Sequence, residues 1–303
     1  MKPVLAGLLA LAPAARGATP DDPYVSERGI PSGPVLSEAE RDPKVPPPSA
    51  VLGHRIGDAL TPHDALARYA RALEAASPRV SVATYGTTPE GRELLRVAVS
   101  TPGNLVRLDA IASGLKSLAA PRATSREAAR SVVERSPAVV WVACGVHGNE
   151  PAGPEACAAL LYTLAASREP GIEELLSSLV VVVDPCVNPD GHERHVGYWR
   201  SVAGDEPDPD PHALENDPPW PAGRGNHFGV DLNRDWAWGT QPETRARIAA
   251  LRALPPQVYV DLHEMGPEQS YFFPPPAEPV HPRVPEAARR WIEEFGRANA
   301  EAF

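Results

Sequence analysis

The 303-residue sequence has no apolar run long enough to cross a membrane as a helix, so we expect no membrane span. Its basic residues are outnumbered, with 29 Lys and Arg against 39 Asp and Glu and a formal net charge of −10. A surface for nucleic acid or anionic lipid needs a basic patch, and this charge balance argues against one. We therefore expect no nucleic-acid partner.

Cysteine is scarce as well, and the three residues Cys144, Cys157 and Cys186 are not spaced as a metal-binding knuckle. Cys144 and Cys186 lie in apolar runs typical of strands, so we expect small buried side chains at both positions. A disulfide between Cys144 and Cys186 is the less favoured alternative, and it requires an exported protein.

The first residues of the chain indicate export. Lys2 precedes the apolar stretch 4–12, and residues 15–17 include small side chains of the kind found at signal-peptidase sites. We interpret residues 1–17 as a signal peptide and expect a secreted or periplasmic protein; a short buried or frayed helix is the alternative. Residues 18–60 are proline-rich and without periodicity, which predicts an N-terminal arm.

The remaining residues, 61–303, show strand and helix patterns in alternation. Strands are predicted at 80–85, 94–100, 138–144, 179–184 and 258–262. Helices are predicted at 61–76, 104–116, 125–135, 153–166, 241–254 and 285–303, and an inserted loop at 201–226. The nearly all-apolar run at 179–184 is typical of a strand buried on both faces. This alternation predicts an α/β sandwich with a mixed or largely parallel sheet.

A polar turn that contains His147 and Glu150 follows the strand predicted at 138–144. A strand end is rigid, so side chains just beyond it can be held in fixed positions. Imidazole nitrogen and carboxylate oxygen are two of the ligand types that a catalytic zinc accepts. Such a pair is common in solvated turns, however, so its meaning depends on the rest of the sequence.

Three further polar clusters follow or close apolar runs, at 188–191 with Trp199 and Arg200, at 229–235, and at 258–264. In α/β sheets, ligands bind outside the carboxyl ends of the strands. We expect His147, Asn188 and His263 at such ends, where they can converge. Each cluster alone has an ordinary explanation, since Asn-Pro-Asp-Gly is a common turn and an exposed arginine is usually a solvated charge. Their occurrence together, in this order, is hard to attribute to chance.

From about His63 onward the chain resembles the zinc carboxypeptidases of the carboxypeptidase A/B type, particularly their secreted bacterial members. The matching features are, in order, Tyr85-Gly86 with Glu90-Gly91-Arg92, His147-x-x-Glu150, Asn188-Pro-Asp-Gly191, Trp199-Arg200, Asn233-Arg234 and His263. The resemblance implies a three-layer sandwich with a mixed, largely parallel central sheet. It also implies a catalytic domain that extends over residues 61–303.

The resemblance implies that His147, Glu150 and His263 bind one Zn²⁺ per chain and leave a position open for water. It implies that Arg200 stabilises the oxyanion that forms at the scissile carbonyl. Asn233 and Arg234 match the pair that binds the terminal carboxylate of a peptide or protein substrate, a task suited to a bidentate guanidinium. The expected activity is hydrolysis of the C-terminal peptide bond.

The chain departs from the family pattern at several positions. Asn149 replaces an arginine that contacts the substrate in many members. Glu264 and Met265 stand where the animal enzymes have a serine and an aromatic residue, and we expect Glu264 to have a structural role. The family's catalytic glutamate lies on a later strand, so we expect it beyond Phe303. The catalytic domain would then be C-terminally incomplete, and we expect poor folding or weak zinc binding.

Two other hypotheses stay open from the sequence. His-Gly-Asn-Glu, Asp-Leu-Asn-Arg and Asp-Leu-His also resemble the aspartoacylase and succinylglutamate desuccinylase group, which cleaves N-acyl amino acids. The Asn-Pro-Asp-Gly and Glu-Gly-Arg turns and the export signal favour the peptidase. The other hypothesis is a non-catalytic zinc- or peptide-binding fragment, in which Asn233 and Arg234 serve recognition alone.

Overall fold

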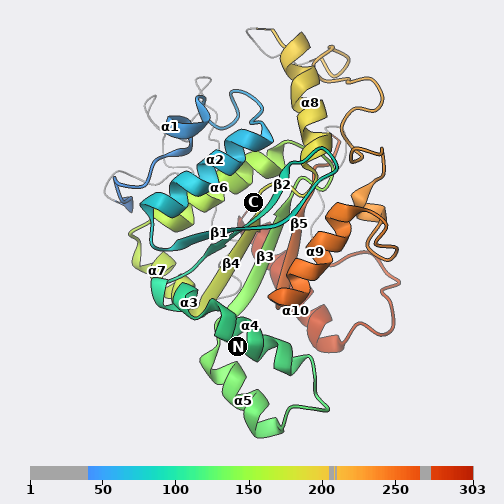
Figure 1. Cartoon of the computed structure of the whole chain (residues 1–303). Helices are drawn as coiled ribbons and strands as arrows, with labels where there is room; N and C mark the ends of the chain where they lie inside the picture. The colour runs from blue at the N-terminus through green and yellow to red at the C-terminus, as the bar shows by residue number, and fades with distance from the viewer. Residues whose placement is uncertain (1–39, 205–207, 209, 267–273, 303) are drawn as a thin grey trace.

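The computed structural model describes residues 40–204, 208, 210–266 and 274–302 (Figure 1). The predicted signal peptide at 1–17 and the predicted arm as far as residue 39 lie outside the described residues. The elements are, in chain order, α1 (Pro48–Leu52), α2 (His63–Ala76), β1 (Val80–Thr87), β2 (Glu93–Val99), α3 (Pro102–Val106), α4 (Leu108–Leu118), α5 (Arg126–Arg135), β3 (Ala138–Cys144), α6 (Ala152–Ala166), α7 (Pro170–Ser178), β4 (Leu179–Asp184), α8 (Pro189–Val202), η3 (Leu232–Arg234), α9 (Pro242–Ala253), β5 (Val258–Leu262) and α10 (Glu286–Ala302). No helix in these ranges is both long and apolar enough to cross a membrane.

The five strands form one mixed sheet in the order β1-β2-β4-β3-β5. β1 with β2 and β2 with β4 are antiparallel pairs, whereas β3 is parallel to both β4 and β5. β4 is buried along its whole length and β3 along nearly all of it, as their apolar sequences predict. β5 is half-buried throughout and forms one edge of the sheet. The predicted α/β fold with a mixed sheet is confirmed.

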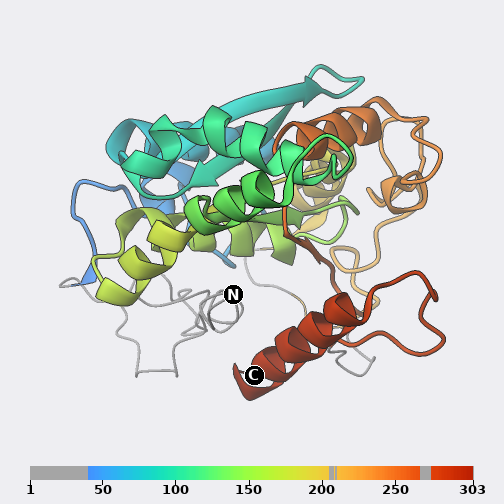
Figure 2. The ribbon, with the colours of Figure 1, turned by 90° about the horizontal axis from the view of Figure 1, so that it is seen from below.

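Helices cover both faces of the sheet, which gives the molecule three layers (Figures 1 and 2). On one face α1, α2, α6 and α7 pack in a core that includes Leu73, Leu164 and Leu176. On the other face α4 and α9 form a second core around Trp141, which is completely buried. Helix α10 lies along one side of the molecule, and its Phe295 packs against the first core.

Helix α8 differs from the sequence-based expectation of a turn at Asn188 and a loop from Ser201. The Asn188 side chain accepts a hydrogen bond from the Gly191 amide at 3.1 Å, and Pro189 occupies the first position of the helix. An asparagine cap followed by proline begins a helix as readily as it begins a turn. Helices α1, α3 and α7 were also not predicted, and each begins at or just before a proline.

The disulfide also differs from the pairing considered above. Cys144 is joined to Cys157, while Cys186 is a free, buried cysteine. Cys157 lies on α6, which packs against the end of β3 where Cys144 lies. The pairing follows from this contact between a helix and a strand end, which no local sequence pattern encodes. The expectation of a buried thiol side chain holds for Cys186.

The burial of His195 predicts that the stability of the fold depends on pH. His195 on α8 is 8% exposed, and burial, together with the nearby charge of His192, lowers its pKa to about 4. Since the unfolded pKa is about 6.5, the unfolded state binds the extra proton at intermediate pH. The contribution of His195 to stability is therefore complete above about pH 6.5 and is lost as the pH falls through about 4.

We expect wild-type protein to lose about 1–2 kcal/mol more unfolding free energy than His195→Gln between pH 7 and pH 5. Urea denaturation at the two pH values measures this difference. Replacement of the exposed His212 by Gln is the matched control and should behave as wild type. Equal losses in His195→Gln and wild type would show that His195 does not titrate as described.

Candidate metal centre

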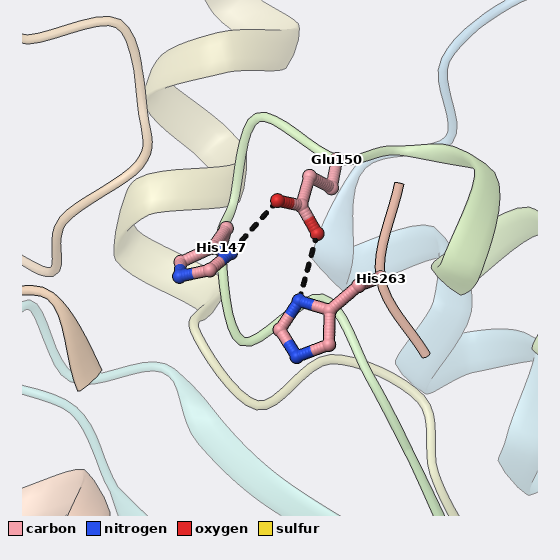
Figure 3. A group of neighbouring side chains, drawn as sticks. All are labelled: His147, Glu150 and His263. Carbon is pink, nitrogen blue, oxygen red and sulfur yellow. Dashed lines mark hydrogen bonds and ion pairs between the residues drawn. The ribbon is translucent and has the colours of Figure 1, made fainter. Parts of the chain in front are cut away.

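His147, Glu150 and His263 come together at the carboxyl edge of the sheet (Figure 3). His147 and Glu150 lie in the loop between β3 and α6, and His263 directly follows β5. Because β3 and β5 are parallel neighbours, with Cys144 opposite Leu262, the segments that follow them lie side by side. One ligand atom of each of the three side chains lies within 4.8 Å of the others.

Both histidines present the same ring nitrogen to one carboxylate. Nδ1 of His147 lies 2.7 Å from Oε1 of Glu150, and Nδ1 of His263 lies 3.1 Å from Oε2. The amide of Glu264 also donates to Oε2, at 3.0 Å. Burial alone would raise the pKa of Glu150, but the hydrogen bonds from the two histidines outweigh it and lower the pKa to about 2. Hydrogen bonds to Asp261 and then to Glu150 raise the pKa of His263 to about 9.

The chemistry of this donor set fits Zn²⁺. Two imidazole nitrogens and a carboxylate oxygen form one of the ligand sets of catalytic zinc, and they leave a coordination position open. The side chain of His147 is 4% exposed and that of His263 is 33% exposed, so solvent reaches the group from the His263 side. These three side chains could therefore hold a metal that is accessible to a substrate.

A second group of potential donors, Glu90, Asp190 and His227, fits a metal less well. The guanidinium of Arg92 donates to Glu90 at 2.5 Å and to Asp190 at 2.7 Å. The Thr88 hydroxyl also donates to Asp190, whose side chain is completely buried. Arg92 therefore already supplies the positive charge that balances these two carboxylates. Through these contacts the Glu-Gly-Arg turn is held against the start of α8.

The loop that carries His147 and Glu150 is shaped by close backbone packing at Gly148. A Cβ atom at this position would lie 2.2 Å from the His192 amide nitrogen and 2.3 Å from the Gly191 carbonyl carbon. The Asn188 side chain donates to the carbonyls of Val146, at 3.3 Å, and Arg224, at 3.2 Å. The Asn-Pro-Asp-Gly motif therefore shapes the metal loop and the loop around Arg224.

Asp231 connects this group to the predicted carboxylate-binding pair. Its Oδ1 lies 3.1 Å from Nε2 of His147 and accepts a hydrogen bond from the amide of Asn233 at 2.8 Å. Asn233 and Arg234 belong to η3, which directly follows Asp231, and Arg234 is exposed. The sequence did not identify Asp231 as a partner of His147, because the two residues are 84 positions apart.

Arg200 is exposed in the last turn of α8, roughly 18 Å along the helix axis from Asn188 at 1.5 Å per residue. Arg224 lies much nearer to the three donors. Its Nη1 is 3.7 Å from Oε1 of Glu150, and its Nη2 is 3.1 Å from Oδ2 of Asp231. Sequence reasoning missed Arg224, because it lies in a loop without periodicity and a single arginine there resembles a solvated charge.

Comparison with known proteins identifies the family of the chain. A sequence model of the family described as zinc carboxypeptidase matches residues 66–302. Mouse carboxypeptidase D is 34% identical over 118 residues, which cover 38% of this chain and 7% of that protein. Carboxypeptidase 2 of Trichophyton rubrum is 28% identical over 140 residues, or 44% of this chain and 21% of that protein.

Among solved structures, carboxypeptidase A from Helicoverpa armigera has a TM-score of 0.47 and 18% identity, over 72% of this chain and 52% of that one. The chain thus spans less than two thirds of the length of each of these relatives. The family model and the two sequence relatives are described as carboxypeptidases, so they give no support to the N-acyl amino acid hydrolase hypothesis.

We expect Gly148→Ala to weaken zinc binding, because the added methyl group would force the metal loop away from the start of α8. Overpacking of this kind costs about 1–3 kcal/mol, which corresponds to an affinity loss of about 5- to 150-fold. Competition with a chromophoric chelator measures the affinity. Gly171→Ala is the control, since its new methyl group would meet no atom within 4 Å. An unchanged affinity in Gly148→Ala would contradict this account of the loop.

Proposed function

Because the chain belongs to the zinc carboxypeptidase family, we propose that it is a metallocarboxypeptidase that hydrolyses the C-terminal bond of peptides or proteins. The observation that carries the proposal is the convergence of two Nδ1 atoms, from His147 and His263, on the Glu150 carboxylate. These three side chains would hold one Zn²⁺. When bound, the metal supplies a Lewis acid that polarises a carbonyl and lowers the pKa of a water ligand.

Asn233 and Arg234 are proposed to bind the terminal carboxylate of the substrate. Two contacts of Asp231 support this role, because Asp231 fixes the backbone of Asn233 and at the same time contacts His147. The anion-binding pair and the metal group are therefore held by one side chain. A guanidinium in this place fixes both the position and the direction of a carboxylate, so the last peptide bond would lie beside the metal group.

Two arginines are candidates for stabilising the oxyanion of the transition state. The family resemblance assigns this role to Arg200, and that assignment stays a prediction. The distances favour Arg224, whose guanidinium lies 3.7 Å from a Glu150 oxygen and is 47% exposed. A cation fixed beside the metal group can act where negative charge develops, and its salt bridge to Asp231 holds it there.

The general base, expected as a glutamate on a later strand, stays a prediction. Glu264 does not serve this role, because its carboxylate accepts a hydrogen bond from the Ala152 amide at the start of α6, at 2.5 Å. This contact supports the structural role expected for Glu264. The proposed secreted or periplasmic location depends on the predicted signal peptide at residues 1–17.

Metal analysis tests the proposed ligands directly. At saturating free zinc we expect one Zn²⁺ per wild-type chain, and no stoichiometric zinc in His147→Ala or His263→Ala, since each variant loses one of three protein ligands. His227→Ala removes a residue of the second donor group and should retain the metal. Zinc retained by His147→Ala, or lost from His227→Ala, would show that the ligands are assigned to the wrong group.

Kinetics on hippuryl-type peptides separate the two arginines. We expect Arg224→Met to lower kcat about 10²–10³-fold with a smaller effect on KM, as for the loss of one oxyanion-stabilising group. Arg200→Met should change kcat by less than about threefold, since its side chain lies at the far end of α8. The opposite ranking would restore Arg200 to the role that the family resemblance implies.

Chelation should abolish hydrolysis of these peptides, and added zinc should restore it. N-acetylaspartate and N-succinylglutamate serve as comparison substrates. Turnover of either of these, without turnover of the peptides, would overturn the proposed reaction and leave the zinc ligands unaffected.

A further inference from the structure

A polar cluster lies between the sheet and α9, beside the second core. It consists of Tyr85, Asp184, Arg247, Tyr259 and Asp261, which come from three strands and one helix. Arg247 is completely buried, and its guanidinium carbon lies 3.9 Å from the centre of the Trp236 ring. Asp184 is also completely buried, and one of its oxygens accepts a hydrogen bond from the Tyr85 hydroxyl at 2.6 Å. A charged residue at such depth needs compensation from groups of opposite charge.

The cluster is held together by charge more than by direct hydrogen bonds. The positive charge of Arg247 and the negative charge of Asp261 both act on Asp184 and on Tyr259. All three side-chain nitrogens of Arg247 and Oδ1 of Asp261 are buried without a partner that meets strict hydrogen-bond geometry among the described residues. Removal of the guanidinium would leave the Asp184 carboxyl group, which is completely buried, without a compensating cation.

Asp261 connects this cluster to the metal group. Asp261 and His263 are two residues apart at the end of β5, so their side chains project toward the same side. Oδ2 of Asp261 lies 3.6 Å from Nε2 of His263, while Nδ1 of the same ring faces Glu150 at 3.1 Å. His147 has the same arrangement, with Nδ1 on Glu150 and Nε2 on Asp231. Each candidate zinc histidine is thus placed between Glu150 and an aspartate.

We propose that Asp261 is a positioning residue for His263. Asp261 keeps a proton on Nε2 and sets the ring plane, which leaves Nδ1 directed at the metal position. Asp231 does the same for His147 at the solvent side, where Arg224 compensates its charge. This inference rests on the proposed zinc site for its effect on affinity.

Nuclear magnetic resonance of the metal-free protein tests the contact itself. We expect a downfield, slowly exchanging Nε2 proton of His263, assigned by its absence in His263→Gln. This signal should disappear in Asp261→Ala. Ala250→Gly, a buried substitution on α9, loosens that helix without removing charge and should retain the signal. A signal that persists unchanged in Asp261→Ala would overturn the proposal, whether or not the chain binds zinc.

Zinc affinity, measured by competition with a chelator, tests the consequence. We expect Asp261→Ala to bind zinc about 10- to 100-fold more weakly, as for other carboxylates that orient a ligating histidine. An equal loss in Ala250→Gly would reduce the effect to general loosening of the fold.

If the wild-type chain binds no zinc at all, the proposed function fails, while the resonance measurement still decides whether Asp261 positions His263. The two results are therefore separable.

Discussion

The Glu150 carboxylate is the contact on which the candidate site depends. Four groups meet it: Nδ1 of both histidines, the amide of Glu264 and the guanidinium of Arg224. These groups belong to three chain segments, which the sheet and the contacts of Asn188 bring together. The negative charge of Glu150 attracts the polar hydrogens of all four groups. The two Nδ1 atoms that lie against Glu150 are those proposed to face a metal ion.

Most of the family's sequence motifs shape this site without contributing chemistry to it. Asn188 ties together the loops that carry His147 and Arg224, and Asp190 binds the Glu-Gly-Arg turn through Arg92. Gly148 permits a backbone approach that no side chain would allow. The metal group therefore needs a larger set of buried polar contacts than the three ligands, and each contact satisfies a group that would be costly to bury alone.

Local patterns were enough to predict the five strands and the placement of His147 and His263 at strand ends, whereas the set of three donors was implied by the family resemblance. β3 and β4 are apolar along their length, and His147, Glu150 and His263 directly follow strand ends, so chain direction alone brings them to one edge. Long-range contacts were not predictable in this way. The partnership of Asp231 with His147, the approach of Arg224 and the bond between Cys144 and Cys157 depend on how loops and helices pack. α8 was missed because an asparagine cap followed by proline fits a turn equally well.

The position of β5 has a consequence for how the site opens. β3 is paired on both sides and buried, whereas β5 is paired with β3 alone among the described strands and is half-buried throughout. Segments with few packed neighbours open at a lower free energy than the core of a fold. Within the described residues, local opening of β5 would therefore separate His263 from His147 and Glu150 while β3 stays folded.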